Sequence, residues 1–300
     1  MERLRDALLG WHVVHGRDLP WRRTRDPYAI LVSEVMLQQT QVDRVAPKYE
    51  QWLGVFPSFG ALASAPLSEA IRLWAPLGYN RRPVRLHRIA VHVVEKLGGR
   101  LPPDPVGLVL LEGIGRYTAN AVASFAFDFQ VAVVDTNVSR VVRRLFGREL
   151  GSGGATPRAV DGAAQRLLPA GRAYEWNQAM MDLGATVCSA RAPSCLVCPL
   201  MEVCETRGEG VSVEAKRAAE SAGSYVAEEP FRTSARFYRG RIVDALRALA
   251  AGRRVRLAEL AEVGDPSLGE LSSDRLEELV AALAKDGLVV MDEAGGIALP

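Results

Sequence analysis

The sequence predicts a mainly α-helical protein with a small α+β module at its C-terminal end. Apolar residues recur at helical spacing along most of the chain as far as residue 205. Residues 207–229 lack this periodicity and have the composition of a linker. Residues 230–300 then show three helical stretches, followed by two short strands around Gly295 and Gly296.

The length and composition suit two domains. A chain of 300 residues with 48% hydrophobic residues can bury a sizeable core. We predict one domain over 1–206, a linker over 207–229 and a second domain over 230–300. No apolar run approaches the roughly 20 residues that span a bilayer, and the amphipathic, acid-containing N-terminus differs from a signal peptide. We therefore expect a soluble cytoplasmic protein without membrane contact.

Helices follow one another through the first domain. The amphipathic N-terminal segment predicts the first. The stretch 31–49 predicts a helix, a polar break at Gln38–Thr40 and a second helix, and Thr40 with Asp43 three residues later resembles a capping box that starts it. Further helices are predicted over 66–75, 83–97, 116–126, 137–145, 157–168 and 173–186.

Two carboxylates stand at places where chemistry is possible. Glu34 lies between apolar neighbours, where burial raises the pKa of a glutamate enough to hold a proton near neutrality. Asp135 ends an apolar run and precedes a helix, so it can cap that helix by accepting from the backbone of Asn137 or Val138. From the residues alone, a solvent-facing glutamate and a purely structural cap are the alternatives.

Two further features are suited to phosphate. Gly113 and Gly115 in "LLEGIGRYTANAVASFAF" allow a close backbone approach, and the helix from Arg116 begins with free N–H groups. A simple tight turn is the alternative. The stretch 231–256 contains eight arginines and a single acid, Asp244. It suits a phosphate backbone or, equally, a solvated helix face.

The four cysteines lie within 17 residues, with the spacing C-x6-C-x2-C-x5-C. A disulfide framework would be distributed over a secreted chain. Four thiols in one loop favour a metal site over inert thiols. Their chemistry leaves zinc and an iron–sulfur cluster both open.

Seven motifs, in order over residues 10–206, resemble the MutY family of adenine DNA glycosylases. They are "GRDLPWR", "SEVMLQQTQV", "LGYN", "GIGRYTANAV", "VDTNVSRV", "NQAMMDLGATVCS" and the cysteine loop. The resemblance implies a two-lobed helix-hairpin-helix DNA glycosylase fold with an iron–sulfur cluster loop. It also implies one 4Fe–4S cluster, whose ligands would be Cys188, Cys195, Cys198 and Cys204.

The resemblance implies further roles, residue by residue. The catalytic residues are Glu34 as the acid, with Asp135, Tyr117 and Asn137. The residues that line the adenine pocket are Trp21, Arg22, Leu37 and Gln178. The residues that wedge into the duplex or contact the opposite base are Gln39, Thr40, Leu77 and Tyr79. The residues that bind DNA phosphate are Gly113, Gly115 and Arg116.

The reaction that this resemblance implies is removal of adenine mispaired with 8-oxoguanine or guanine, by base flipping and acid-assisted hydrolysis. Tyr117 stands where lyase relatives carry lysine, so base removal should leave the strand uncut. Thr136, Asn80 and Glu112 depart from the family pattern. We expect a monomer that acts on mismatched double-stranded DNA in the cytoplasm, at the nucleoid. The alternatives are a glycosylase for another base, such as thymine opposite guanine, and a non-enzymatic DNA-binding protein with a redox cluster.

The C-terminal segment departs most from the family. The module that recognises 8-oxoguanine in that family is not evident in residues 230–300. Their pattern resembles a winged helix instead. The third predicted helix carries Asp274, Glu277 and Glu278, which suit a major groove poorly. We expect either DNA binding or a role in packing or protein contact.

Overall fold

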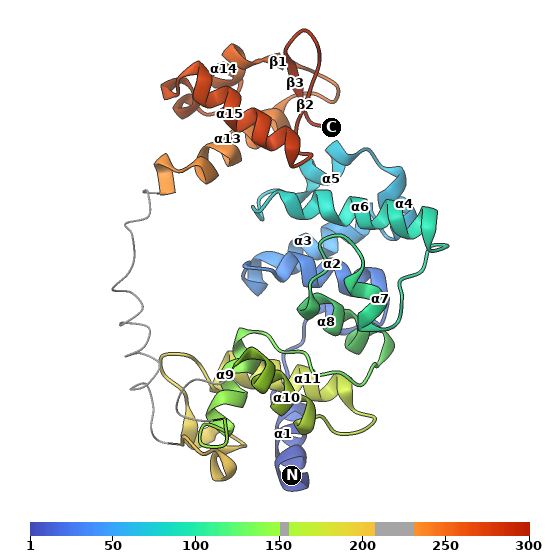
Figure 1. The fold of residues 1–300 in the computed structure, drawn as a ribbon, viewed down its shortest axis with the longest axis vertical. Coiled ribbons are helices and arrows are strands. Elements are labelled where there is room, and N and C mark those ends of the chain that lie inside the picture. Colours follow the sequence, from blue (N-terminus) through green and yellow to red (C-terminus); the bar gives the residue numbers. More distant parts are fainter. Residues whose placement is uncertain (151–155, 208–230) are drawn as a thin grey trace. The chain divides into compact units, whose positions relative to one another are not determined.

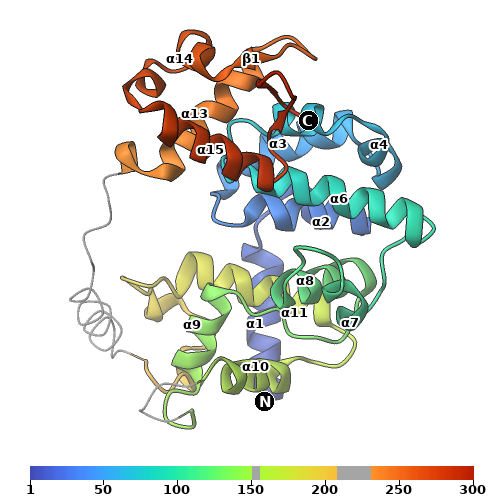
Figure 2. The ribbon, with the colours of Figure 1, turned by 45° about the horizontal axis from the view of Figure 1, so that its top comes forward.

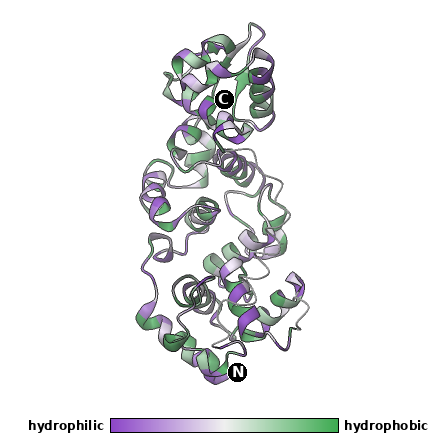
Figure 3. Ribbon diagram, turned by 90° about the vertical axis from the view of Figure 1, so that its left-hand side faces the viewer, coloured by the Kyte–Doolittle hydropathy of each residue, from purple (hydrophilic) through white to green (hydrophobic). Residues whose placement is uncertain are grey.

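The structure is a computed structural model that describes residues 1–150, 156–207 and 231–300 (Figure 1). These residues are mainly helical, as predicted, and the helices carry both hydrophilic and hydrophobic residues (Figure 3). The predicted linker lies outside the described residues, apart from Arg207. None of the helices in the described ranges has both the length and the apolar character needed to span a bilayer.

The chain groups into two compact units. The first comprises Met1–Glu34 and Pro102–Tyr225, and the second comprises Val35–Leu101 and Val226–Pro300. The border falls within one helix, α2 (Pro27–Leu37), directly after Glu34. The described C-terminal residues therefore belong to the same unit as residues 35–101.

The first unit is built around a helical core. Its other helices are α1 (Glu2–His15), α7 (Pro105–Val109), α8 (Arg116–Phe127), α9 (Thr136–Leu145), α10 (Pro157–Leu167) and α11 (Ala173–Asp182). α11 continues as a π-helical turn, Leu183–Val187. Leu8, Val142 and Trp176 are among the side chains buried in the core. The helices predicted over 116–126, 137–145 and 157–168 are confirmed to within two residues at their ends.

The N-terminal part of the second unit holds α3 (Val42–Val55), α4 (Phe59–Ser64), α5 (Leu67–Trp74) and α6 (Arg81–Lys96). α4 and α6 lie side by side (Figure 2). Trp52 and Trp74 are fully buried and meet edge to face, with ring centroids 5.4 Å apart. α5 and α6 were predicted. α4 was not, because six residues are too few to show a helical period.

The predicted capping box at the start of α3 is wrong. Gln41 is the N-cap residue, and no side chain caps this helix end. The hydroxyl of Thr40 instead donates to the carbonyl of Gln38 at 3.3 Å and accepts a hydrogen bond from Arg82 at 3.1 Å. The Thr40 hydroxyl, which the local pattern assigned to a helix cap, is therefore bound by Arg82 from another helix.

Residues 231–300 form the C-terminal module. Its elements are α13 (Ala235–Ala248), β1 (Val255–Arg256), α14 (Leu260–Val263), α15 (Ser273–Lys285), β2 (Val290–Met291) and β3 (Gly296–Ala298). The strands form an antiparallel sheet of order β1-β3-β2, in which Ile297 pairs with Val255 on one side and Met291 on the other. This order of helices and strands is that of a winged helix (Figure 1). β1 was not predicted, and Gly296 belongs to β3 rather than to the turn.

Candidate active site

Glu34 is buried and incompletely paired. It lies in α2 with 4% of its surface exposed, and its Oε2 atom has no hydrogen-bond partner among the described residues. Burial raises the pKa of Glu34 to about 7, against a hydrogen bond from Tyr117; the negative charge of Asp135 raises the pKa further, and Arg22 lowers it. A carboxyl group with this pKa is protonated in a large share of molecules at neutral pH.

Asp135 lies close to Glu34 and is held by hydrogen bonds. It is the N-cap of α9, where Oδ1 accepts from the Val138 backbone at 2.6 Å, as the sequence predicted. Its Oδ2 accepts from Asn137 Nδ2 at 3.0 Å. Arg140 in turn donates to Asn137 Oδ1 at 2.9 Å. The carboxylate is therefore fixed in position next to the buried acid.

The π-helical turn explains why a glycine stands at position 184. A Cβ atom on Gly184 would lie 2.9 Å from the Cβ of Asn137 and 3.1 Å from its carbonyl oxygen. The Gly184 carbonyl also accepts from Arg140 at 2.6 Å. The π-helical turn thus packs directly against Asn137 and binds Arg140. Both contacts hold Asn137, which orients Asp135.

Tyr117 is a direct hydrogen-bond partner of Glu34. It lies at the start of α8 and donates a hydrogen bond to Glu34. Burial, followed by the charges of Glu34 and Asp135, raises the pKa of Tyr117 well above its usual value. The phenol therefore stays protonated and can donate to the carboxylate of Glu34 after that group has lost its proton.

A buried ion-pair network holds Arg22, for which the family resemblance implies a place in an adenine pocket. Asp182 is fully buried and accepts two hydrogen bonds of 2.7 Å from the Arg22 guanidinium. Arg17 donates to it through its backbone and its side chain, and His12 lies at 3.3 Å. Burial opposes ionisation of Asp182, yet Arg22, His12 and Arg17 together hold its pKa far below its usual value. Sequence reasoning missed Asp182, although it lies in the motif "NQAMMDLGATVCS".

The other residues predicted to line an adenine pocket are divided between the two units. Trp21 and Gln178 are buried in the first unit. Gln178 follows Asn177, whose side chain bonds Ser124 at 2.9 Å and the backbone of Val131 and Val133. Leu37 belongs to the second unit. The structure thus brings Glu34, Tyr117, Asp135 and Asn137 together, with Arg22 in electrostatic reach of Glu34.

The helix-hairpin-helix is present as predicted. Asp104 caps α7 by accepting from the backbone of Val106 and Gly107, both at 3.0 Å. Gly113 has φ +83°, a conformation that side chains rarely adopt, and Gly115 is the N-cap of α8. The predicted role of Gly113, Gly115 and Arg116 in phosphate binding stays a prediction. Arg116 is mostly exposed and pairs with Asp161 at 2.7 Å.

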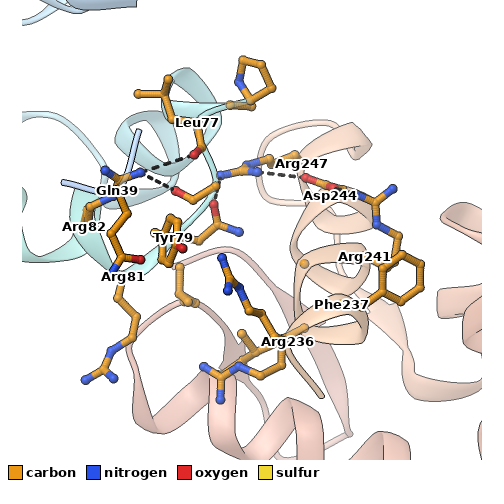
Figure 4. A pocket seen from close by; sticks show the side chains of 18 of the residues that line it. Gln39, Leu77, Tyr79, Arg81, Arg82, Arg236, Phe237, Arg241, Asp244 and Arg247 are labelled. Carbon is orange, nitrogen blue, oxygen red and sulfur yellow. Dashed lines mark hydrogen bonds and ion pairs between the residues drawn. The ribbon is translucent and has the colours of Figure 1, made fainter. Parts of the chain in front are cut away.

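The wedge candidates lie on two loops of the second unit. Gln39 has φ +54° and Tyr79 has φ +49°, both in the left-handed region that costs free energy for residues other than glycine. Leu77 is buried and Tyr79 is 41% exposed. Both loops line a pocket of about 1050 Å³, of which part is shown in Figure 4.

Arg82 ties these two loops together, and sequence reasoning missed it. Its side chain is 4% exposed, and burial lowers its pKa to about 10. Its two terminal nitrogens donate hydrogen bonds of 2.6–3.3 Å to the carbonyls of Val35, Met36, Gln38, Leu77 and Gly78 and to the hydroxyl of Thr40. These acceptors flank Gln39 on both sides and directly precede Tyr79. The clamp therefore fixes the two strained backbones.

The four cysteines lie close enough together in the first unit to influence one another electrostatically. All four are half-buried, and the thiols of Cys188, Cys195 and Cys204 act electrostatically on that of Cys198. Arg144 donates to Cys188 Sγ at 3.3 Å, and its carbonyl accepts from Cys204 Sγ at 3.5 Å. Within the described ranges no three His, Cys, Asp or Glu side chains converge closely enough to hold a single metal ion.

Comparison with known proteins identifies the family. Residues 32–169 match the model described as "HhH-GPD superfamily base excision DNA repair protein". An adenine DNA glycosylase of Mycolicibacterium smegmatis is 39% identical over 295 residues, which cover 97% of this chain and 94% of that protein. The chain belongs to the adenine DNA glycosylase family. The human adenine DNA glycosylase is 46% identical over 215 residues, which cover 68% of this chain and 39% of that protein.

Solved structures agree with the fold of this family. A thermostable thymine-DNA glycosylase has a TM-score of 0.64 and 31% identity, and the match covers 69% of this chain and 98% of that one. A trapped endonuclease III–DNA covalent intermediate has a TM-score of 0.60 and 23% identity, with 69% and 95% covered. The helix-hairpin-helix glycosylase fold predicted from the motifs is therefore confirmed. Proteins of this kind commonly carry a 4Fe–4S cluster, and the chain has the four cysteines that one requires.

Proposed function

We propose that this enzyme removes adenine mispaired with 8-oxoguanine or guanine in double-stranded DNA, acting as a monomer through residues 1–206. The observation that carries this proposal is the state of Glu34. It is buried, hydrogen-bonded by Tyr117 and placed beside Asp135, with a pKa raised to about 7. Such a group can give a proton at neutral pH, which a paired surface glutamate cannot.

The chemistry needs one proton donor and one fixed negative charge. Adenine leaves poorly until a ring nitrogen is protonated, and the sugar then develops oxocarbenium character. Glu34 donates that proton, the N-glycosidic electron pair goes to the base, and the carboxylate of Asp135 stabilises the positive sugar. Water adds to the anomeric carbon and releases a proton, which restores Glu34. The products are free adenine and an abasic site.

The supporting residues follow from the same scheme. Tyr117 keeps its O–H and stabilises the ionised Glu34, while Asn137 orients Asp135 through its 3.0 Å hydrogen bond. A phenol cannot form a Schiff base, so the strand is left intact. We assign the flipped adenine to Trp21, Arg22 and Gln178 of the first unit, and keep Leu37 of the second unit as a further candidate for contact with the base.

The wedge loops and the hairpin are assigned to the duplex. Gln39 and Tyr79 offer a flat amide and an aromatic ring for stacking in the gap left by the flipped base, and Thr40 and Leu77 lie beside them. Gly113, Gly115 and Arg116 are assigned to a backbone phosphate at the start of α8. These contacts position the DNA and do not read its sequence.

We further propose that one 4Fe–4S cluster is held by Cys188, Cys195, Cys198 and Cys204. In such a cluster each thiolate binds a different iron, so the ligands need not converge on one point, as they must around a single zinc ion. The grouping of the four thiols and the guanidinium at Cys188 suit a negatively charged cluster. When bound, the cluster supplies structural cross-linking and the capacity for one-electron exchange.

A thymine-releasing activity is the second candidate. It is favoured by the similarity to the thymine-DNA glycosylase, and Thr136 departs from the pattern of the adenine enzymes. Single-turnover assays on duplexes with A opposite 8-oxoguanine, A opposite G and T opposite G decide between the two. Release of adenine alone supports the first proposal, and release of thymine alone refutes it. Binding without release of any base would indicate a non-enzymatic protein. Glu34→Gln is the matched control, because it keeps the shape of the site and removes the proton donor.

A further inference from the structure

The C-terminal module is docked on the helices that carry the wedge loop, within the second unit. Arg247 in α13 is the central contact, with 10% of its side chain exposed. It donates to the carbonyl of Ile71 at 3.0 Å and to Asn80 Oδ1 at 2.9 Å, and its own carbonyl accepts from Arg72. The chain end adds a backbone hydrogen bond of 2.8 Å from Ser68 to the carbonyl of Pro300.

Several arginines predicted to suit a phosphate backbone form ion pairs within the protein instead. Arg241 and Arg247 pair with Asp244, at 2.8 and 2.9 Å. Arg239 pairs with Asp286, which also forms an ion pair with Arg81 of α6 at 3.3 Å. The sequence could not separate these paired arginines from the rest of the block.

Arg236 has a different contact. It is exposed in the first turn of α13, and its guanidinium lies over the ring of Tyr79 at 4.4 Å from the centroid. Arg82 lies at 5.2 Å from the same centroid, and Figure 4 shows the ring between the two arginines. Arg236 forms no ion pair with a carboxylate among the described residues. Its charge is therefore directed at the aromatic face and the open pocket.

The Tyr79 side chain needs such a contact to hold its position. The clamp of Arg82 fixes the backbone of the loop, but the ring is 41% exposed and would otherwise sample several rotamers. An aromatic ring that must stack in a duplex gap loses less entropy on binding when it is already held. A flat guanidinium on its face supplies this restraint and leaves the ring edge free.

We propose that the C-terminal module is a positioning element for opposite-base discrimination, and that Arg236 acts as a positioning residue through Tyr79. This inference rests on the proposed function. It gives residues 231–300 a role that needs no direct contact between the module and the base. The module presents Arg236 to the wedge loop, and Arg247 fixes the docking of α13 beside Asn80.

The test uses the full chain with Arg236→Ala and Arg236→Lys, and Arg232→Ala as the matched control. Arg232 lines the same pocket, is exposed and carries the same charge, and it lies on the 3-10 turn Phe231–Thr233 just before α13. The readout is the ratio of single-turnover adenine excision rates opposite 8-oxoguanine and opposite guanine. Arg236→Ala should lower this ratio about two- to five-fold, or about 0.4–1 kcal/mol. Arg232→Ala should leave it unchanged, and Arg236→Lys should retain more than half of it.

A double-mutant cycle shows whether the effect passes through the ring. In a Tyr79→Leu background, Arg236→Ala should no longer change the ratio. An equal effect in both backgrounds, an equal effect of Arg232→Ala, or no effect of Arg236→Ala would each overturn the proposal. If the wild-type chain excises no adenine, the proposed function fails. The same cycle, measured on the ratio of Kd for mismatched and fully paired duplexes, then still decides the coupling between Arg236 and Tyr79.

Discussion

Glu34→Gln should inactivate the enzyme and make its stability less sensitive to pH. The pKa of Glu34 is raised by burial from 4.5 in the unfolded chain to about 7 in the fold. Between these values the folded protein holds a proton that the unfolded chain has released, so the free energy of unfolding falls as pH rises. This decrease in the free energy of unfolding is complete above about pH 7. At ~1.4 kcal/mol per pKa unit it amounts to about 3 kcal/mol.

The variant removes this penalty because glutamine does not titrate. Its amide oxygen can still accept from Tyr117, while its N–H₂ group takes the place of Oε2, which has no partner among the described residues. Burying that donor costs about 1–3 kcal/mol, but at every pH alike. The stability difference between variant and wild type should therefore shift by about 2.5 kcal/mol in favour of the variant from pH 5 to pH 8.

Urea unfolding of both proteins at pH 5 and pH 8 measures this shift. Glu50→Gln, at an exposed glutamate of α3, is the surface control and should change the free energy of unfolding by less than ~0.5 kcal/mol. Adenine release should be lost in Glu34→Gln while duplex binding stays within about tenfold, and the wild-type rate should fall as pH rises through about 7. A stability difference that is the same at both pH values would refute the raised pKa, and with it the argument for Glu34 as the acid.

Three further outcomes are expected. The purified chain should be brown, with about four iron and four sulfide per molecule, and stoichiometric zinc in a colourless sample would contradict the cluster. Borohydride should trap no covalent adduct with the product strand, because Tyr117 has no amine; efficient trapping would show that a lysine substitutes. Asp182→Asn should destabilise the fold by about 3 kcal/mol, since it leaves the buried guanidinium of Arg22 unpaired. Asp18 pairs with Arg23 at the surface, where both side chains are mostly exposed. In urea unfolding, Asp18→Asn should therefore cost much less stability than Asp182→Asn, and equal costs of the two variants would contradict the role of Asp182.

The sequence predicted those parts of the fold that rest on local pattern. The cap at Asp135, the hairpin glycines and the long helices depend on neighbours within a few residues, and all are confirmed. The buried state of Glu34 was also expected, because its apolar neighbours surround it on the same helix.

Contacts between residues far apart in the sequence could not be predicted in this way. Asp182 and Arg22 are 160 residues apart, and nothing near either shows that they pair. Strand β1 has two residues and is defined by its pairing with β3 rather than by its own pattern. Thr40 matched a capping pattern, yet its hydroxyl accepts a hydrogen bond from Arg82 of another helix.

The way in which Arg82 is bonded bears on how the two proposed wedge loops can change. All but one of its hydrogen-bond acceptors are main-chain carbonyls, which any amino acid supplies. Side chains at positions 39, 77 and 79 can therefore be exchanged while the loops keep their shape, provided that each tolerates its backbone conformation. The backbone held by Arg82 thus forms a constant support for side chains that can vary. Variation at these positions can proceed one side chain at a time, whereas a change at Arg82 alters both loops at once.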